Sequence, residues 1–266
     1  MNINSVKLVY FSPTKTTEKA VEGIAQGIQV DIVEQLDLTP PEARTREFEE
    51  MHDELVIIGA PVYGGRIPPK AVYRLRRIKG NGTPAGVVAV YGNRAYEDAL
   101  LELRDLAVEL GFRPVAGGAF IGEHSYDSEA TPIASGRPDA QDLEKAKGFG
   151  ELIREKMREM RTLDEMPSLQ VPGDFPYKEW GPPSDISPLT DETQCTLCEI
   201  CATICPTAAI TVGDTVMTDQ NACILCSACV KNCSTGARAW ENPWVTGAAN
   251  WLSTNCRERK EPEMYL

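Results

Sequence analysis

Hydrophobic and polar positions alternate in blocks over the first 160 residues of the chain. Short apolar runs, typical of buried strands, cover residues 6–11, 30–36, 55–59, 85–91 and 113–121. Stretches with apolar residues at helical spacing lie between and after these runs, over residues 16–28, 69–78, 96–110 and 143–160. This alternation predicts an α/β domain built on a doubly wound, five-stranded parallel sheet.

The loops after three of these strands hold the candidate binding residues, because ligands of such sheets lie beyond the carboxyl ends of the strands. The loop after the first strand offers four hydroxyl groups and a lysine at the start of a predicted helix, namely Ser12, Thr14, Lys15, Thr16 and Thr17. Hydroxyl groups and the free N–H groups of a helix start can bind a phosphate monoester. The alternative is a helix cap with additional threonines.

Glycines beside tyrosines mark the other two loops. The loop after the third strand contributes Pro61, Val62, Tyr63, Gly64 and Gly65. The loop after the fourth strand contributes Gly92, Asn93, Arg94 and Tyr96. Glycine lets the backbone approach a flat ring closely, and tyrosine can stack on such a ring. Together with the phosphate loop, these residues shift the interpretation from a helix cap toward a nucleotide-like ligand.

With these three loops, residues 5–160 resemble a flavodoxin-type domain, which binds FMN through the same loops. The resemblance implies that the hydroxyl groups of the first loop hold the FMN phosphate, while the other two loops bracket the isoalloxazine ring, with Tyr63 and Tyr96 as stacking partners. Lys15 departs from short-chain flavodoxins, which usually carry glycine there, and adds a cation beside the phosphate. No G-x-G-x-x-G motif follows a predicted strand, which argues against a resident NAD site.

The connection at residues 122–138 is longer than most loops of compact domains, and loops of this length are often functional lids. It contains His124, which could donate a proton to a substrate above the flavin. An ordinary solvated loop histidine is the alternative. His124 is therefore the one weak candidate for a catalytic residue.

Residues 166–189 hold six prolines and few helix signals, and they predict a semi-rigid linker that carries the aromatic residues Phe175, Tyr177 and Trp180. A stiff linker would fix the distance between the parts that it joins. The predicted division of the chain is 1–162 for the sheet domain, 163–189 for the linker, 190–240 for a second domain and 241–266 for a helical extension.

All nine cysteines lie after residue 194, which points to metal binding rather than to disulfides. Two copies of the spacing C-x2-C-x2-C-x3-C occur, formed by Cys195, Cys198, Cys201 and Cys205 and by Cys223, Cys226, Cys229 and Cys233. This spacing is typical of bacterial 4Fe-4S clusters, in which three cysteines bind one cluster and the fourth binds the other. Zinc sites usually group cysteines in pairs with long spacers instead.

The expected ligands of the first cluster are therefore Cys195, Cys198, Cys201 and Cys233. Those of the second cluster are Cys223, Cys226, Cys229 and Cys205. Residues 191–239 resemble two-cluster bacterial ferredoxins, small α+β domains, except that Ser234 stands where a proline usually follows the last ligand. Cys256 lies outside both motifs and is predicted to be a spare thiol, and residues 241–259 are predicted to form an extra helix.

The net charge and the hydropathy of the chain limit the kinds of partner that it can bind. The formal net charge of −12 would repel a nucleic acid backbone and suits basic redox proteins or small electron acceptors. No apolar stretch approaches the length of a membrane span, and residues 1–7 lack the features of a signal peptide. We therefore expect a cytoplasmic protein with no membrane or nucleic acid partner.

Nearly the whole chain resembles the flavodoxin-ferredoxin fusion family. The resemblance implies an iron-sulfur flavoprotein with FMN and two 4Fe-4S clusters that moves low-potential electrons and converts one-electron into two-electron transfer. Two alternatives stay open at this point. One is a reductase that reduces a small oxidised substrate or dioxygen at FMN, and the other is a ferredoxin with a flavin-free docking domain. The sequence leaves open whether the protein is an enzyme.

Overall fold

The computed structural model describes residues 3–163, 166–181 and 185–266. Residues 1–2, at the start of the predicted first domain, and residues 164–165 and 182–184, within the predicted linker, lie outside the described part. The larger domain is built on a six-stranded sheet with the strand order β10-β5-β4-β3-β1-β2. Its five parallel strands are β1 (Ser5–Tyr10), β2 (Ile32–Asp37), β3 (Leu55–Pro61), β4 (Thr83–Tyr91) and β5 (Phe112–Ile121).

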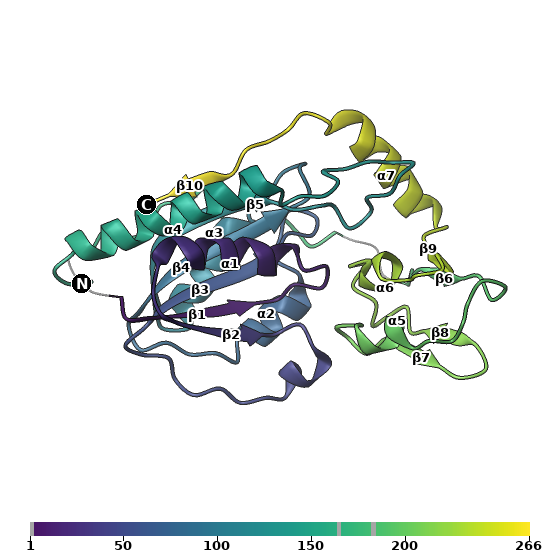
Figure 1. Ribbon diagram of the computed structural model, residues 1–266, viewed down its shortest axis with the longest axis horizontal. Helices are drawn as coiled ribbons and strands as arrows, with labels where there is room; N and C mark the ends of the chain where they lie inside the picture. Colours follow the sequence, from purple (N-terminus) through teal and green to yellow (C-terminus); the bar gives the residue numbers. More distant parts are fainter. Residues whose placement is uncertain (1–2, 164–165, 182–184) are drawn as a thin grey trace.

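The order 2-1-3-4-5 of these five strands is that of flavodoxin-like folds, so the predicted doubly wound parallel sheet is confirmed. The strands β3 and β4 are almost wholly buried, as expected for parallel strands that are covered on both faces. Figure 1 shows the sheet between two helical layers. These helices are α1 (Thr16–Ile28), α2 (Pro69–Leu75), α3 (Ala99–Glu109) and α4 (Ala140–Glu159), with a short 3-10 helix, η1 (Pro41–Arg44), between β2 and β3.

The helices α1 and α4 pack tightly on one face of the sheet. A side chain at Gly27 in α1 would place its Cβ 1.8 Å from the carbonyl oxygen of Lys147 in α4, so only glycine fits there. The helix α4 begins with a capping box, in which Asp139 accepts hydrogen bonds from backbone N–H groups and the Asp142 side chain accepts from the N–H of Asp139. This packing fixes the loops at the carboxyl ends of β1 and β5.

The linker lies against the sheet domain. Both carboxylate oxygens of Asp98 accept hydrogen bonds from the linker backbone, from the N–H groups of Asp174 and Lys178. The hydroxyl of Tyr177 donates to Asp105 over 2.6 Å, and the guanidinium of Arg66 lies 4.8 Å from the centre of the Tyr177 ring. Among the three aromatic residues of the linker, Tyr177 is the anchor, whereas Phe175 and Trp180 are largely exposed.

The smaller domain contains two short antiparallel strand pairs and two short helices. The strand β6 (Leu189–Thr190) pairs with β9 (Arg238–Ala239), and β7 (Ile210–Val212) pairs with β8 (Val216–Thr218). The helices are α5 (Ile200–Thr203) and α6 (Ala228–Lys231), and each begins just before the third cysteine of one motif. This α+β domain lies beside the carboxyl ends of the sheet strands (Figure 1).

The C-terminal extension differs from the predicted helix over residues 241–259. The helix α7 covers only Pro243–Asn255, and the chain then returns to the sheet domain as β10 (Glu263–Tyr265). The strand β10 pairs antiparallel with β5, so the sheet gains a sixth strand that the hydrophobic pattern did not predict. Figure 1 shows this segment crossing from the smaller domain back to the edge of the sheet.

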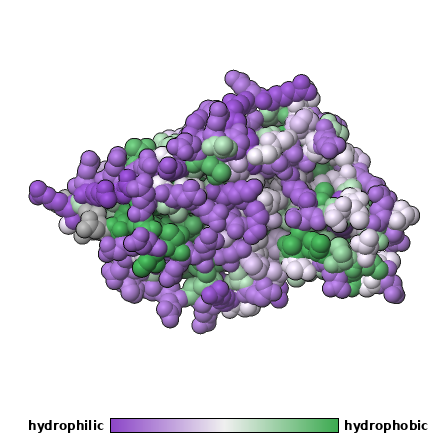
Figure 2. Space-filling model, viewed as in Figure 1, coloured by the Kyte–Doolittle hydropathy of each residue, from purple (hydrophilic) through white to green (hydrophobic). Residues whose placement is uncertain are grey.

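No helix in the described ranges is long and apolar enough to cross a bilayer. Hydrophilic residues dominate the face of the molecule in Figure 2, with smaller hydrophobic patches on both domains.

Candidate functional site

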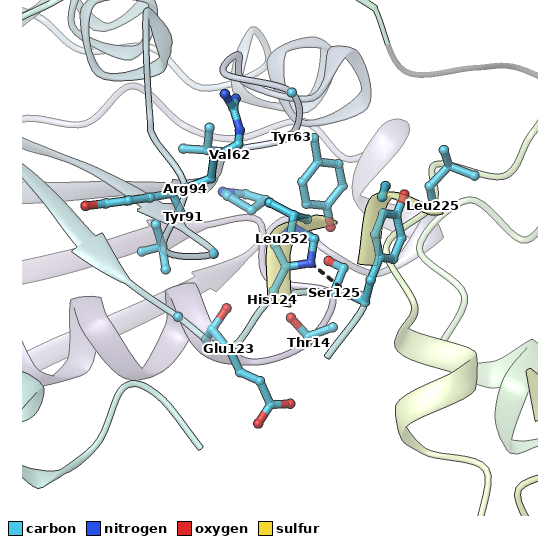
Figure 3. Close-up of a pocket in the computed structure, with 18 of the residues that line it drawn as sticks. Thr14, Val62, Tyr63, Tyr91, Arg94, Glu123, His124, Ser125, Leu225 and Leu252 are labelled. Carbon is cyan, nitrogen blue, oxygen red and sulfur yellow. Dashed lines mark hydrogen bonds between the residues drawn. The ribbon is translucent and has the colours of Figure 1, made fainter. Parts of the chain in front are cut away.

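A cavity of about 500 Å³, the main cavity, lies where the two domains meet, beyond the carboxyl ends of β3, β4 and β5. The loops of the sheet domain form one side of it. The smaller domain adds Ile224 and Leu225, the linker adds Lys178 and Gly181, and α7 adds Trp244, Ala248, Trp251 and Leu252. In Figure 3, Tyr63, His124 and Leu225 surround the cavity from three separate segments of the chain. The site thus needs the C-terminal extension as well as both domains.

The predicted phosphate loop forms one end of this cavity, where Thr14 and Thr16 line it. Thr17 is fully buried, and its Oγ1 has no hydrogen-bond partner among the described residues. A buried hydroxyl without a partner costs free energy, so this orphaned atom suits a ligand oxygen. The donor set and the open helix start therefore fit a phosphate group.

Two other residues of this loop have structural partners. The Oγ of Ser12 accepts a hydrogen bond from the backbone N–H of Glu18 over 3.0 Å, which stabilises the first turn of α1. Lys15 has a left-handed backbone with φ of 64°, and its ammonium pairs with Glu18 over 2.7 Å. Glycine adopts this conformation more easily than lysine does.

The loop after β3 lines the cavity through Pro61, Val62, Tyr63 and Gly64. Tyr63 forms a hydrogen bond with Ser125, and burial raises the pKa of its phenol well above the ordinary value. Gly65 instead faces away from the cavity, and a Cβ there would lie 1.9 Å from a carboxylate oxygen of Glu97. Its φ of 88° also favours glycine. Gly65 therefore shapes the loop rather than the cavity wall.

In the loop after β4, Gly92 and Arg94 line the cavity, whereas Asn93 and Tyr96 lie outside its lining. The side-chain amide of Asn93 donates to the carbonyl oxygens of Cys256 and Glu258. The hydroxyl of Tyr96 bonds to Glu263 over 2.8 Å and to Tyr265 over 2.9 Å. The structure thus places these two residues under the C-terminal segment, which differs from the expectation that Tyr96 stacks on a ring.

His124 lies in the cavity wall and packs against Gly92. Its Nδ1 accepts a hydrogen bond from the backbone N–H of Tyr126 over 3.0 Å, so the neutral ring carries its proton on Nε2. Burial lowers the pKa of His124 to about 4. At pH 7 the imidazole is neutral, and it can donate a hydrogen bond from Nε2 but holds little of the imidazolium form that a proton donor needs.

Two smaller cavities in the second domain are each lined by four cysteines. One is lined by Cys195, Cys198, Cys201 and Cys233, and the other by Cys205, Cys223, Cys226 and Cys229. These are the same two groups that the sequence spacing predicts, including the exchange of the fourth cysteine between motifs. Within the described residues, no group of three or more His, Cys, Asp or Glu side chains could hold a metal ion as placed.

The thiols of the second group are deeply placed. Burial raises the pKa of the Cys223 thiol to about 11 and raises that of Cys229 as well, although the nearby Arg238 guanidinium opposes both shifts. A thiol must lose its proton to bind iron, so loading of this site is coupled to proton release.

Ile224 is a lining residue of both the main cavity and the second cysteine cavity. It lies one residue after Cys223, and no other residue of the smaller domain is shared by these two cavities in the described part of the chain. The two domains are also tied by an ion pair between Lys231 in α6 and Glu123 beside His124. The second cysteine group and the main cavity are therefore adjacent.

Comparison with known proteins supports the smaller domain directly. A family model described as a 4Fe-4S binding domain matches residues 188–211, which include the first cysteine motif. No match was found among curated proteins.

Solved structures similar to the sheet domain include flavodoxins. A flavodoxin from the domain Archaea is 16% identical and covers 58% of this chain and 99% of its own, with a TM-score of 0.37. A flavodoxin of Fusobacterium nucleatum bound to flavin mononucleotide is 19% identical and covers 59% and 99%, also with a TM-score of 0.37. The flavodiiron protein of Giardia intestinalis is 19% identical and covers 58% and 36%, with a TM-score of 0.36.

The fold and the family match define an iron-sulfur protein with a flavodoxin-like domain. The strand order establishes the flavodoxin-like domain, and the family model establishes the 4Fe-4S domain that follows it. The chain thus joins the two parts that characterise flavodoxin-ferredoxin fusions, in the order that the sequence resemblance predicts.

Proposed function

We propose that this protein is an iron-sulfur flavoprotein that moves low-potential electrons between two 4Fe-4S clusters and FMN. When bound, FMN exchanges one or two electrons and each cluster exchanges one, so the chain can join one-electron to two-electron chemistry. The proposed partners are basic redox proteins or a small-molecule acceptor in the cytoplasm, in keeping with the acidic chain.

The observation that carries this proposal is the position of Ile224. This residue lines both the cavity proposed for FMN and the cavity of the second cysteine group. Electron transfer between cofactors weakens with distance, so two sites that share a wall residue are placed to exchange electrons. The cavity of the first cysteine group shares no lining residue with the main cavity, and its Cys198 is exposed and accessible to an external partner.

The phosphate loop and the main cavity fit FMN in two respects. Thr14, Thr16 and the orphaned hydroxyl of Thr17 offer donors to a phosphate. Tyr63 presents an aromatic ring in the cavity wall. The proposal thus keeps the phosphate loop and Tyr63 as binding residues and gives Asn93 and Tyr96 a supporting role.

A reductase is the second candidate, and the segments that line the cavity favour it. The wall includes residues 122–126 of the long loop, Lys178 and Gly181 of the linker, and four residues of α7. A protein that only carries electrons can leave its flavin edge open, whereas a roofed cavity can hold a small oxidised substrate and exclude water. In this form of the proposal, His124 orients the substrate by a hydrogen bond from Nε2.

The test is an anaerobic titration of the purified protein with dithionite, together with assays of iron and FMN. We expect about eight irons and one FMN per chain, with flavin and cluster absorbance both bleached on reduction. Reoxidation by an added acceptor should then require FMN. Full iron without flavin would overturn the proposal and leave a ferredoxin with a docking domain.

The same titration separates the two candidates. A carrier should reoxidise with protein acceptors and show little preference among small molecules. A reductase should show saturable reoxidation by one class of small oxidised molecule, and Trp251→Ala in the roof should weaken that saturation without lowering the iron or FMN content.

A further inference from the structure

Arg238 lies in the walls of both cysteine cavities. It belongs to β9, where Thr190 of β6 is its partner in the strand register. Only 3% of the residue is exposed, although it carries a full positive charge. A buried charge is costly unless it is paired, and within the described part of the chain Arg238 forms no ion pair. The groups around the guanidinium must therefore compensate this charge.

The guanidinium donates three hydrogen bonds to residues of the same domain. It donates to the hydroxyl of Thr190 over 2.7 Å, to the hydroxyl of Thr218 over 3.1 Å and to the Sγ of Cys229 over 3.7 Å. The Nε atom is buried and has no hydrogen-bond partner among the described residues. Two threonines thus hold the group in place, while one donor meets a cysteine sulfur and another is left unpaired.

We infer that Arg238 is a positioning and charge-compensating residue that both cluster sites share, and that it raises the reduction potential of each cluster. This inference rests on the proposed function, because it assumes two clusters. A reduced cluster carries one more negative charge than an oxidised one, so a fixed cation nearby favours the reduced form. The unpaired Nε–H and the bond to Cys229 are the kind of donors that stabilise negative charge on cluster sulfurs.

The increase in reduction potential caused by Arg238 should differ between the two cluster sites. Cys229 belongs to the group with Cys205, Cys223 and Cys226, and that group receives the direct hydrogen bond. For the group that contains Cys195, Arg238 is a lining residue of the cavity. The cluster next to the main cavity is therefore expected to gain the larger increase in potential. Electrons would then be drawn from the exposed cluster toward the one beside Ile224.

The test is a redox titration of the intact protein monitored by electron paramagnetic resonance, with iron content measured on each sample. In Arg238→Met, we expect the reduction equilibrium constant of the cluster bound through Cys229 to fall about tenfold, which corresponds to about 59 mV for one electron. The other cluster should shift in the same direction by less. Arg158→Met removes an exposed arginine from α4, outside both cysteine cavities, and should leave both potentials unchanged.

Two further variants test the inference if Arg238→Met loses iron. Arg238→Lys keeps the charge and should retain most of the potential, whereas Arg238→Gln keeps a hydrogen-bond donor without charge and should show the decrease. Equal potentials in these two variants would overturn the inference, as would unchanged potentials in an iron-replete Arg238→Met protein. Loss of iron from all three variants would also overturn it, because the residue would then only support the fold.

The unaltered protein, measured in parallel, separates this inference from the proposed function. Iron well below about eight per chain in the unaltered protein would contradict the two-cluster function itself. A full iron content with no effect of Arg238 on either potential would contradict only the inference about Arg238.

Discussion

The guanidinium of Arg74, in α2 of the sheet domain, donates a hydrogen bond to the carbonyl oxygen of Pro206 in the 4Fe-4S domain. Pro206 directly follows Cys205, one of the four cysteines around the second cysteine cavity. The same guanidinium also donates to the carbonyl oxygens of Leu38 and Thr39, and Arg74 is only 3% exposed. One buried side chain thus connects the end of β2 to a cluster site.

Replacement of Arg74 by methionine should destabilise the protein and loosen the domains, because three buried carbonyl groups lose a charged donor. We expect the free energy of unfolding to fall by about 2–4 kcal/mol, measured by urea unfolding under anaerobic conditions. Arg76→Met is the matched control, since Arg76 pairs with Glu109 at the surface and its loss should cost under about 1 kcal/mol. Equal effects of the two substitutions would contradict the role of Arg74.

Thr17→Val should weaken FMN binding without destabilising the flavin-free protein. The Thr17 hydroxyl is buried and has no partner among the described residues, so its removal costs no internal hydrogen bond. If it donates to the phosphate, the loss of about 1.5–3 kcal/mol should raise the Kd for FMN roughly ten- to hundredfold. The Kd is measured by quenching of flavin fluorescence.

Thr17→Ser is the control for this substitution, because it keeps the hydroxyl and should bind FMN nearly as well as the unaltered protein. An unchanged Kd in Thr17→Val would show that the phosphate is held elsewhere.

Ile224→Ala should slow electron transfer between the clusters and FMN by several-fold while leaving the iron and FMN contents intact. The reason is that Ile224 fills the wall between the two cavities, and a shorter side chain leaves a gap there. The rate is measured by stopped-flow reduction with dithionite, observed at flavin and cluster wavelengths. Leu225→Ala is the matched control, since Leu225 lines the main cavity but not the cysteine cavity. A similar rate in both variants would argue against a path through residue 224.

The stability of the protein should depend on pH through His124. Burial places the pKa of His124 at about 4 in the folded protein, below the ordinary value of 6.5. Between these values the unfolded chain binds the additional proton, so the stabilisation is complete above pH 6.5 and is lost as the pH falls toward 4. The slope should approach about 1.4 kcal/mol per pH unit within this window.

His124→Asn should remove this part of the pH dependence, as measured by urea unfolding at a series of pH values. His52→Asn, at an exposed position, serves as the control. If the slope of the His124→Asn protein equals that of the unaltered protein, the histidine is not held neutral by burial.

The sequence alone determined the parts of the protein whose signals are local. Strand and helix periods determined the five parallel strands and their helices, because the central strands β3 and β4 are buried on both faces and each helix buries one face. The spacing of the eight motif cysteines determined which four would meet at each cavity, because three closely spaced thiols face one cluster and the fourth is too far along the chain to join them.

The tertiary structure decided what depends on residues distant in sequence. The strand β10 has only three residues, and the charge of Glu263 and the shortness of the segment hide its pairing with β5. Tyr96 looks like a ring-stacking residue until its hydroxyl is seen to hold that strand. A local pattern cannot reveal such partners, because these contacts join chain segments that lie far apart in the sequence.

The same limit applies to the roof of the cavity and to the cluster environment. Trp251 in α7 could be predicted as helical but not as part of the main cavity, and Ile224 and Arg238 carry no sequence signal for their shared positions between cavities. Cysteine ligation depends on short spacings that any fold of this motif must keep. Electronic coupling between sites depends on how whole domains pack, and that packing is set by dispersed contacts such as the one between Arg74 and Pro206.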